Sequence, residues 1–317
     1  MSQGSSGLPQ SARARLAEIK ASGTWASALS TAEFTAIRSV GFVPVGQAFG
    51  ATVVSIKNAG SYGCPTYRPG TERRADGPAY RKPVVHTAVT GSRGANAFRP
   101  LIQALYDARR TAIDRMAAEA EALGGHGVVG VRLTVEPFAA GGLEFSALGT
   151  VIRAPGEPPL LRPFTCELSG QEFTKLLLAG WTPVAIALGI SIGVRHEDKS
   201  TALEASAAAT WNTEVSGHTE LMNRARRDAA DQLRKDVLKY RGTGIVTREM
   251  ELRVEDYECQ SLEGESDYLA EATIVGTVIT RFGQDQAGAA PIASNLILSL
   301  DDRSGIAGFS VIAPEQR

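Results

Sequence analysis

The sequence predicts an α+β protein made of two similar units, each an antiparallel sheet covered by one long helix. Residues 29–50 and 168–189 align without a gap and share 10 of 22 residues, which indicates an internal repeat. A long amphipathic segment follows in each half, at 98–123 and at 221–237. Alternating apolar residues come next, as in strands with one wet face.

Each repeated stretch predicts a short helix that leads into a strand. A serine and a glutamate three residues later have the spacing of a capping box, which satisfies free amides of the first helical turn. A glycine then stands where a helix ends in a left-handed residue, and a proline lies near the strand start, where a missing amide costs least. These structural positions are Ser30, Glu33, Gly41 and Pro44 in the first stretch and Ser169, Glu172, Gly180 and Pro183 in the second.

The long helices carry charges opposite their apolar faces. Arg109, Arg110 and Glu119 are among the residues expected to face away from the core of the first unit. The second helix has a mixed cluster, interpreted as a salt-bridged solvated face or a subunit contact rather than a nucleic-acid stripe. Its members are Arg224, Arg226, Arg227, Asp228, Asp231, Arg234, Lys235 and Asp236. Glycines end both helices and suggest an interface: Gly124, Gly125 and Gly127 in one unit, Gly242 and Gly244 in the other.

Closing strands at 149–152 and 276–279, both Gly-Thr-Val-Ile, complete the units. The predicted organisation is an N-terminal segment (1–28), a first unit (29–153) with an insertion at about 57–83, a linker (154–167), a second unit (168–282) and a tail (283–317). Within the tail, residues 294–300 are compatible with one more strand.

Composition limits the classes of function. The chain has 317 residues, a length that favours two domains, and a net charge of −1, which favours neither nucleic acid nor an anionic membrane as a partner. Its three cysteines are widely spaced and odd in number, as expected of free thiols in a reducing compartment. The longest apolar run, 182–194, has 13 residues, whereas a membrane-spanning helix needs about 20. We therefore expect a cytoplasmic protein without a membrane span.

The segment around the first long helix resembles the YbjQ-like family of small bacterial proteins, whose domains are often described as heavy-metal-binding. The resemblance rests on Gly-Ala-Asn-Ala-Phe at 94–98, the Ala-Arg pair in the helix, and Leu-Gly-Gly-His-Gly-Val-Val-Gly at 123–130. It covers 90–152 well and 175–282 loosely. It implies a βαββ unit similar to a dodecin subunit, present here as a tandem duplication, with relatives that form pentameric rings.

No sequence motif establishes a metal or catalytic site. The four histidines are scattered, and the chain has no Cys-x-x-Cys pair of the kind that structural zinc sites use. His126 is the best single metal candidate, although the favoured interpretation is a turn residue that tolerates an unusual backbone angle. Cys64 is the other weak candidate, in a Tyr/Pro/Gly loop. No nucleophile motif is present, so no catalytic residue and no cofactor are predicted, with a divalent heavy metal left open.

Three functional hypotheses follow. The first is a non-enzymatic protein that assembles with itself into a ring, with five chains as the expected number, and serves as a scaffold or binding module. The second is a heavy-metal-binding or metal-responsive protein, as the family resemblance implies. The third is a protein that binds a small ligand at subunit interfaces. An enzyme ranks last.

Overall fold

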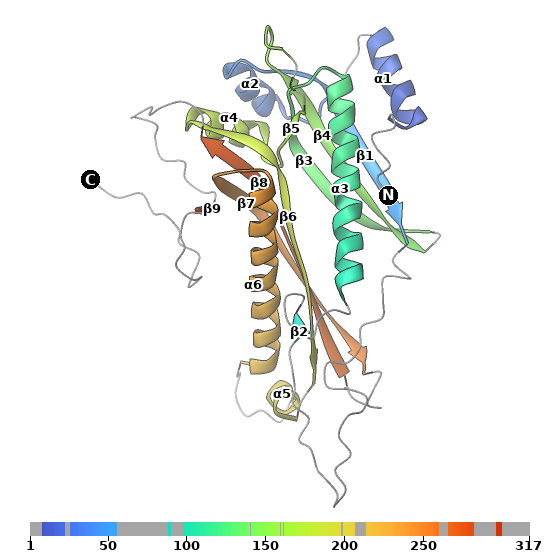
Figure 1. Ribbon diagram of the computed structural model, residues 1–317, viewed down its shortest axis with the longest axis vertical. Coiled ribbons are helices and arrows are strands. Elements are labelled where there is room, and N and C mark those ends of the chain that lie inside the picture. The colour runs from blue at the N-terminus through green and yellow to red at the C-terminus, as the bar shows by residue number, and fades with distance from the viewer. Residues whose placement is uncertain are drawn as a thin grey trace, which may run out of the picture.

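The computed structural model of the protein describes residues 8–22, 26–55, 88–89, 98–139, 141–158, 160, 162–197, 199–206, 214–259, 266–281 and 296–299. Within these ranges there are six α-helices and two β-sheets (Figure 1). The α+β class predicted from the sequence is confirmed. In the described part of the chain, no helix is long and apolar enough to cross a membrane.

The first sheet has the strand order β1-β4-β3-β5. Its strands are β1 (Val43–Val54), β3 (Gly127–Phe138), β4 (Gly142–Arg153) and β5 (Phe164–Thr165). Neighbours pair antiparallel, except that β5 runs parallel to β3. The long helix α3 (Arg99–Ala122) covers one face, α2 (Thr31–Ser39) leads into β1, and α1 (Gln10–Ser22) packs against α3.

The second sheet has the order β2-β6-β8-β7-β9, with every neighbour antiparallel. Its strands are β2 (Ala88–Val89), β6 (Trp181–His196), β7 (Gly244–Glu258), β8 (Ser266–Arg281) and β9 (Leu296–Ser299). The long helix α6 (Ser216–Lys239) covers β6 and β8, while α4 (Gly170–Leu178) leads into β6 and α5 (Lys199–Ala205) packs against α6. In Figure 1, α3 and α6 run nearly parallel.

Both halves follow the same succession of short helix, strand, long helix and strand pair. The strand orders β1-β4-β3 and β6-β8-β7 correspond, and each first strand has an irregularity in its register at its proline, between Pro44 and Gly46 and between Pro183 and Ala185. A proline fits there because the local ladder is already interrupted.

The capping predictions are confirmed at both short helices. Ser30 and Ser169 each accept a hydrogen bond from the backbone amide three residues on, and the glutamate at that position accepts one from the serine amide. Gly41 and Gly180 have φ angles of 84° and 80°, the left-handed conformation expected where these helices end.

A glycine in each first strand lets the long helix approach closely. A Cβ at Gly50 would lie 2.1 Å from the carbonyl oxygen of Ala112, and a Cβ at Gly189 would lie 2.2 Å from that of Ala229. Because backbone atoms cannot yield as a flexible side chain can, only glycine fits at these two crossings.

The apolar core does not stop at the boundary between the halves. One buried cluster joins α3 and the first sheet to Ile186, Leu188 and Ile190 of β6. Another joins Ile37 of α2 and Ile152 of β4 to residues of α4, β7 and β8. The two sheets are thus held together by the hydrophobic effect as well as by the chain.

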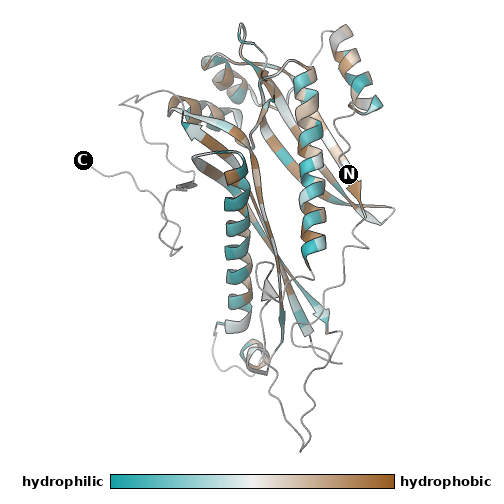
Figure 2. Cartoon of the chain, viewed as in Figure 1, coloured by the Kyte–Doolittle hydropathy of each residue, from teal (hydrophilic) through white to brown (hydrophobic). Residues whose placement is uncertain are grey.

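The expectation that the charged residues of both long helices face solvent is wrong for four of them. Arg109, Glu119, Asp228 and Asp236 are buried, the last with only 2% of its surface exposed. Helical periodicity cannot foresee this, because neighbouring elements cover a second face of each helix. The outer surface of α6 is nonetheless mostly hydrophilic (Figure 2).

Two predicted segments lie largely outside the described residues. The insertion at 57–83, with Cys64, is one of them, and of the tail the structure describes only β9. That strand falls within the predicted 294–300.

Candidate functional site

The contact between the two halves is built along the outer edge of β6. Tyr106 of α3 places its hydroxyl between two backbone groups of that edge, donating to the carbonyl oxygen of Leu188 (3.1 Å) and accepting from the amide of Ile190 (2.9 Å). Burial raises the pKa of Tyr106 to about 12, so the hydroxyl keeps its proton at neutral pH. Arg110, one turn further on, donates to the carbonyl oxygen of Ile186 (3.1 Å).

A buried carboxylate completes this β6 edge contact. Asp236 of α6 accepts hydrogen bonds from the Leu188 amide (2.9 Å) and from Arg110 of α3. The guanidinium of Arg110 also lies over the ring of Tyr240, 5.3 Å from its centroid. The arginine thus ties α3 to both α6 and β6 of the second half, and charge-assisted bonds of this kind are stronger than neutral ones.

The first half has a matching arrangement along β1. Glu119 of α3 accepts a hydrogen bond from the Phe49 amide (2.8 Å) and pairs with Arg15 of α1. Arg15 lies over the Phe49 ring, 5.9 Å from its centroid. We call this the β1 edge contact. In the β1 edge contact, α1 supplies the arginine to a carboxylate of α3, as α3 supplies the arginine to a carboxylate of α6 in the β6 edge contact.

The two contacts use corresponding residues. Glu119 and Asp236 each lie 11 residues after the alanine of the Ala-Arg-Arg sequence in their helix, Ala108 or Ala225. Phe49 and Leu188 hold the same position in the aligned stretches 29–50 and 168–189. The same correspondence holds at the entry to each unit, where the amide of Ala28 donates to Thr150 (3.2 Å) and that of Glu167 to Thr277 (3.1 Å).

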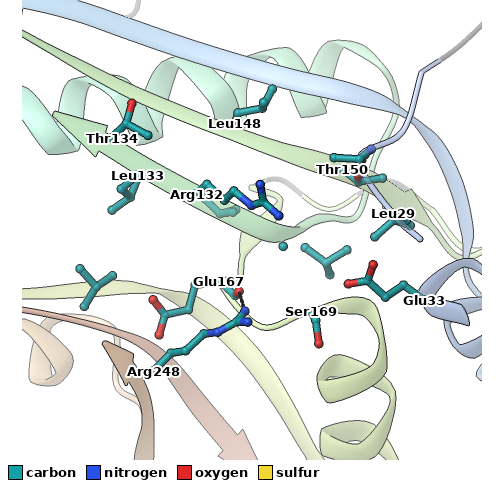
Figure 3. Close-up of a pocket in the computed structure, with 15 residues that line it drawn as sticks. Leu29, Glu33, Arg132, Leu133, Thr134, Leu148, Thr150, Glu167, Ser169 and Arg248 are labelled. Carbon is teal, nitrogen blue, oxygen red and sulfur yellow. Dashed lines mark hydrogen bonds between the residues drawn. The ribbon is translucent and has the colours of Figure 1, made fainter. Parts of the chain in front are cut away.

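A charged cleft of about 490 Å³ opens between the halves, on the face of the first sheet away from α3 (Figure 3). Arg132, Glu33 and Arg248 line it, and Arg248 donates to the carbonyl oxygen of Glu167 (3.3 Å). Burial alone would raise the pKa of Glu33, but hydrogen bonds from Ser30 and Gly170 and the charge of Arg132 hold it below its usual value. The volume is typical of a small-molecule site.

A second cleft, of about 530 Å³, holds the buried Arg109 against the second sheet. The guanidinium of Arg109 lies 5.2 Å from the centroid of the Phe145 ring, and its surroundings include Glu251 and Glu271. Burial raises the pKa of Glu271, with Arg109 and Arg253 offsetting part of the effect. Ionisation of Glu271 is therefore less favourable in the folded state than in the unfolded chain.

Three potential metal ligands meet at the other end of the second sheet. His196 ends β6, Cys259 follows β7, and Asp267 is the second residue of β8. All three are buried, and one ligand atom from each lies within 4.8 Å of the others. The Nδ1 atom of His196 lies 2.8 Å from a carboxylate oxygen of Asp267. Nitrogen, thiolate and carboxylate donors form the ligand set that Zn²⁺ and related ions accept.

His126 occupies a different environment. It is buried, its Nδ1 atom accepts from the amide of Ala154 (3.0 Å), and its Nε2 atom lies 2.8 Å from the carbonyl oxygen of Pro158. Because an amide can only donate, Nε2 carries the proton. The suggested unusual backbone angle is wrong for His126: among described non-glycine residues the positive φ belongs to Arg241. A metal at His126 stays a prediction and would have to displace both bonds.

The junction glycines pack within the chain. A Cβ at Gly125 would lie 2.2 Å from a methyl carbon of Val151, and one at Gly242 2.1 Å from a methyl carbon of Val278. Gly127 lies against the ring of Phe164, Gly124 has a φ of 70°, and Gly244 pairs with Ile279 of β8. Their position at a contact between subunits stays a prediction.

Sequence reasoning missed both edge contacts and the His196, Cys259 and Asp267 group. Cys259 is 63 residues from His196 in the sequence, and their proximity depends on the pairing of both β6 and β7 with β8. A usable signal for the edge contacts did exist. A carboxylate recurs at the same place in both helices, within a row of otherwise apolar positions.

Residues 87–154 match the family model YbjQ_1, described as "Putative heavy-metal-binding". UPF0145 proteins of Halorubrum lacusprofundi and Clostridium perfringens are 53% and 46% identical over 47 and 48 residues, which is 15% of this chain and 45% of each relative. No solved structure is significantly similar to the chain.

A longer match spans most of the chain. The protein named encapsulin nanocompartment protein Rv1762c, from Mycobacterium tuberculosis, is 30% identical over 249 residues, which is 76% of this chain and 82% of that relative. The match is long enough to include both halves in part. The chain therefore belongs to the same family as that mycobacterial protein and carries a YbjQ-like segment at residues 87–154.

Proposed function

We propose that this protein is a non-enzymatic structural subunit that assembles with further copies of itself into a closed particle or ring in the cytoplasm. The observation that carries the proposal is the β6 edge contact, through which one half of the chain binds the other head to tail. Contacts of this type continue from copy to copy, and they close into rings when the rotation allows. The name of the mycobacterial relative, a nanocompartment protein, supports assembly.

The two halves are best explained as a tandem duplication of a YbjQ-like unit, at 29–153 and 168–282. The matching capping boxes, crossing glycines and edge carboxylates support this origin. A ring of five chains is the expected form, from the family resemblance. The charged cleft, lined by two arginines and two glutamates, offers a place between units for a small polar ligand.

Native mass spectrometry and multi-angle light scattering test the assembly directly. At micromolar concentration we expect a discrete oligomer, whose mass corresponds to five chains. A strict monomer across the range from 1 to about 100 μM overturns the proposal, because a structural subunit has to associate well below that concentration.

A second candidate function, metal binding, is favoured by one observation: the buried His196, Cys259 and Asp267 group. A divalent ion would replace the hydrogen bond between His196 and Asp267, and the Cys259 thiolate would add the charge that a soft metal prefers. Three protein ligands leave a fourth position for water or another donor. The group lies outside the segment that matches the family model.

Titration of the purified protein with zinc, copper and nickel tests this site. We expect one tightly bound ion per chain, lost in Cys259→Ser and kept in Cys166→Ser. Cys166 is a matched control because it is also a free, buried cysteine, near Thr277 instead of the histidine. Absence of stoichiometric binding, or equal loss in both variants, overturns the assignment.

A further inference from the structure

The N-terminal helix α1 occupies the place that a long helix holds elsewhere in the fold. Along β6, α3 supplies Arg110 to a buried carboxylate of the next long helix. Along β1, α1 supplies Arg15 to the corresponding carboxylate, Glu119. The β1 edge is thus the face on which a preceding unit would dock, and in the single chain α1 covers it.

The complementary residues lie at the other end of the chain, on α6. Arg227 is the last arginine of the second Ala-Arg-Arg sequence and corresponds to Arg110 of the first. It is exposed, as is Asn223, which corresponds to Tyr106. An asparagine amide both donates and accepts, so Asn223 can bridge a carbonyl and an amide of a strand edge, as the Tyr106 hydroxyl does.

We propose that the β1 edge is the docking site for α6 of a second copy of this chain, and that α1 is a removable cover of that site. In the assembled state Arg227 of the incoming chain replaces Arg15 at Glu119. Asn223 then faces the backbone of Phe49 and Ala51. The inference rests on the proposed self-assembly and specifies the surfaces that carry it.

The attachment of α1 suits a cover that comes off. The helix has 13 residues, near the length at which an isolated helix is marginal in water. Its buried apolar residues are Ala12 and Leu16, which bury much less apolar surface than the long row of buried residues on α3. The side chain of Arg15 keeps 41% of its surface exposed, against 22% for Arg110 in the corresponding contact. The Arg15–Glu119 pair is therefore the weaker of the two.

The short helices are not expected to repeat their contact between chains. Glu33 of α2 accepts from the amide of Gly170 (3.3 Å), and a Cβ at Gly170 would lie 2.8 Å from Ile37. The residue that corresponds to Gly170 is Thr31, which has a Cβ. The arginine contact of the long helices is thus the contact that we expect to form both within one chain and between chains.

Charge reversal of Arg227 in the full chain tests the docking site. We expect Arg227→Glu to raise the concentration for half-assembly at least about tenfold, since it sets a like charge against Glu119. Arg224→Glu is the matched control: it makes the same charge change on the same helix, at an exposed residue that corresponds to the exposed Asp107. Circular dichroism of both variants verifies that they are folded.

Replacement of Arg15 tests the cover. We expect Arg15→Ala to lower the concentration for half-assembly, because Glu119 no longer has to exchange one arginine for another. If Arg227→Glu assembles as the wild type does, the docking site is wrong even though assembly stands. If Arg15→Ala leaves assembly unchanged or weakens it, α1 is not a removable cover. A wild-type chain that stays monomeric contradicts the proposed function itself.

Discussion

Asp236 provides the sharpest test of the contact between the halves. Asp236→Ala leaves the Leu188 amide without its acceptor, which costs about 1–3 kcal/mol for a buried donor. It also leaves Arg110 partly buried without its carboxylate, and the total for a broken buried pair is about 3–5 kcal/mol. Glu119→Ala removes the corresponding group, but Arg15 can turn into water. We therefore expect a smaller loss there, about 1–3 kcal/mol.

Urea unfolding followed by circular dichroism measures these free energies. A single transition is expected because one apolar cluster spans both halves. The double-mutant cycle of Arg110→Ala with Asp236→Ala then gives the coupling energy, which we expect at about 1–3 kcal/mol. The cycle of Arg15→Ala with Glu119→Ala, in which the arginine is 41% exposed although the glutamate is buried, gives less than about 1 kcal/mol. A coupling near zero in the first cycle, or an equal coupling in both, refutes the view that Arg110 and Asp236 join the halves.

Three further predictions concern single positions, each measured by urea unfolding. Gly189→Ala should destabilise the fold by about 3 kcal/mol, because its Cβ meets the carbonyl oxygen of Ala229. Gly41→Ala has open space around it and should cost only about 1 kcal/mol, for its positive φ. Equal costs would contradict the close-approach argument. Arg241→Gly should stabilise by about 0.5 kcal/mol, since glycine relieves the φ of 54° but loses more chain entropy, and a destabilised variant would contradict this. Burial raises the pKa of Glu271, so its carboxylate penalises the fold above that pKa and the penalty fades as pH falls. Wild type should thus gain stability relative to Glu271→Gln between pH 7 and pH 4.5, and a gap that stays constant with pH would exclude this.

The sequence was sufficient for the fold wherever the structure depends on neighbours along the chain. Capping serines and the glycines that end the two short helices are local devices, and they were found where their spacing predicted them. At the end of α6 the left-handed residue is Arg241 instead of a glycine. The contact between the halves could not be foreseen, because Arg110 acquires its role only when β6 lies beside α3.

The same limit applies to the candidate sites. His126 attracted attention through its glycine-rich surroundings, yet its ring is held by backbone groups of the linker. The group at His196 had no sequence signal, since its members come from β6, from β8 and from the residue that follows β7. Local sequence shows which residues could bind a metal, and only strand pairing shows which of them meet.

The side chains along β6 have a consequence for solubility. An uncovered strand edge presents free amides and carbonyls that can template pairing with other chains, and proteins avoid such edges because they lead to aggregation. Here Tyr106, Arg110 and Asp236 occupy those groups at Ile186, Leu188 and Ile190. The strand β2 pairs only with the far end of β6, at Gly193 and Val194, and side chains of long helices cover the stretch from Ile186 to Ile190. Strand addition is therefore blocked along this stretch, while association through helices stays available.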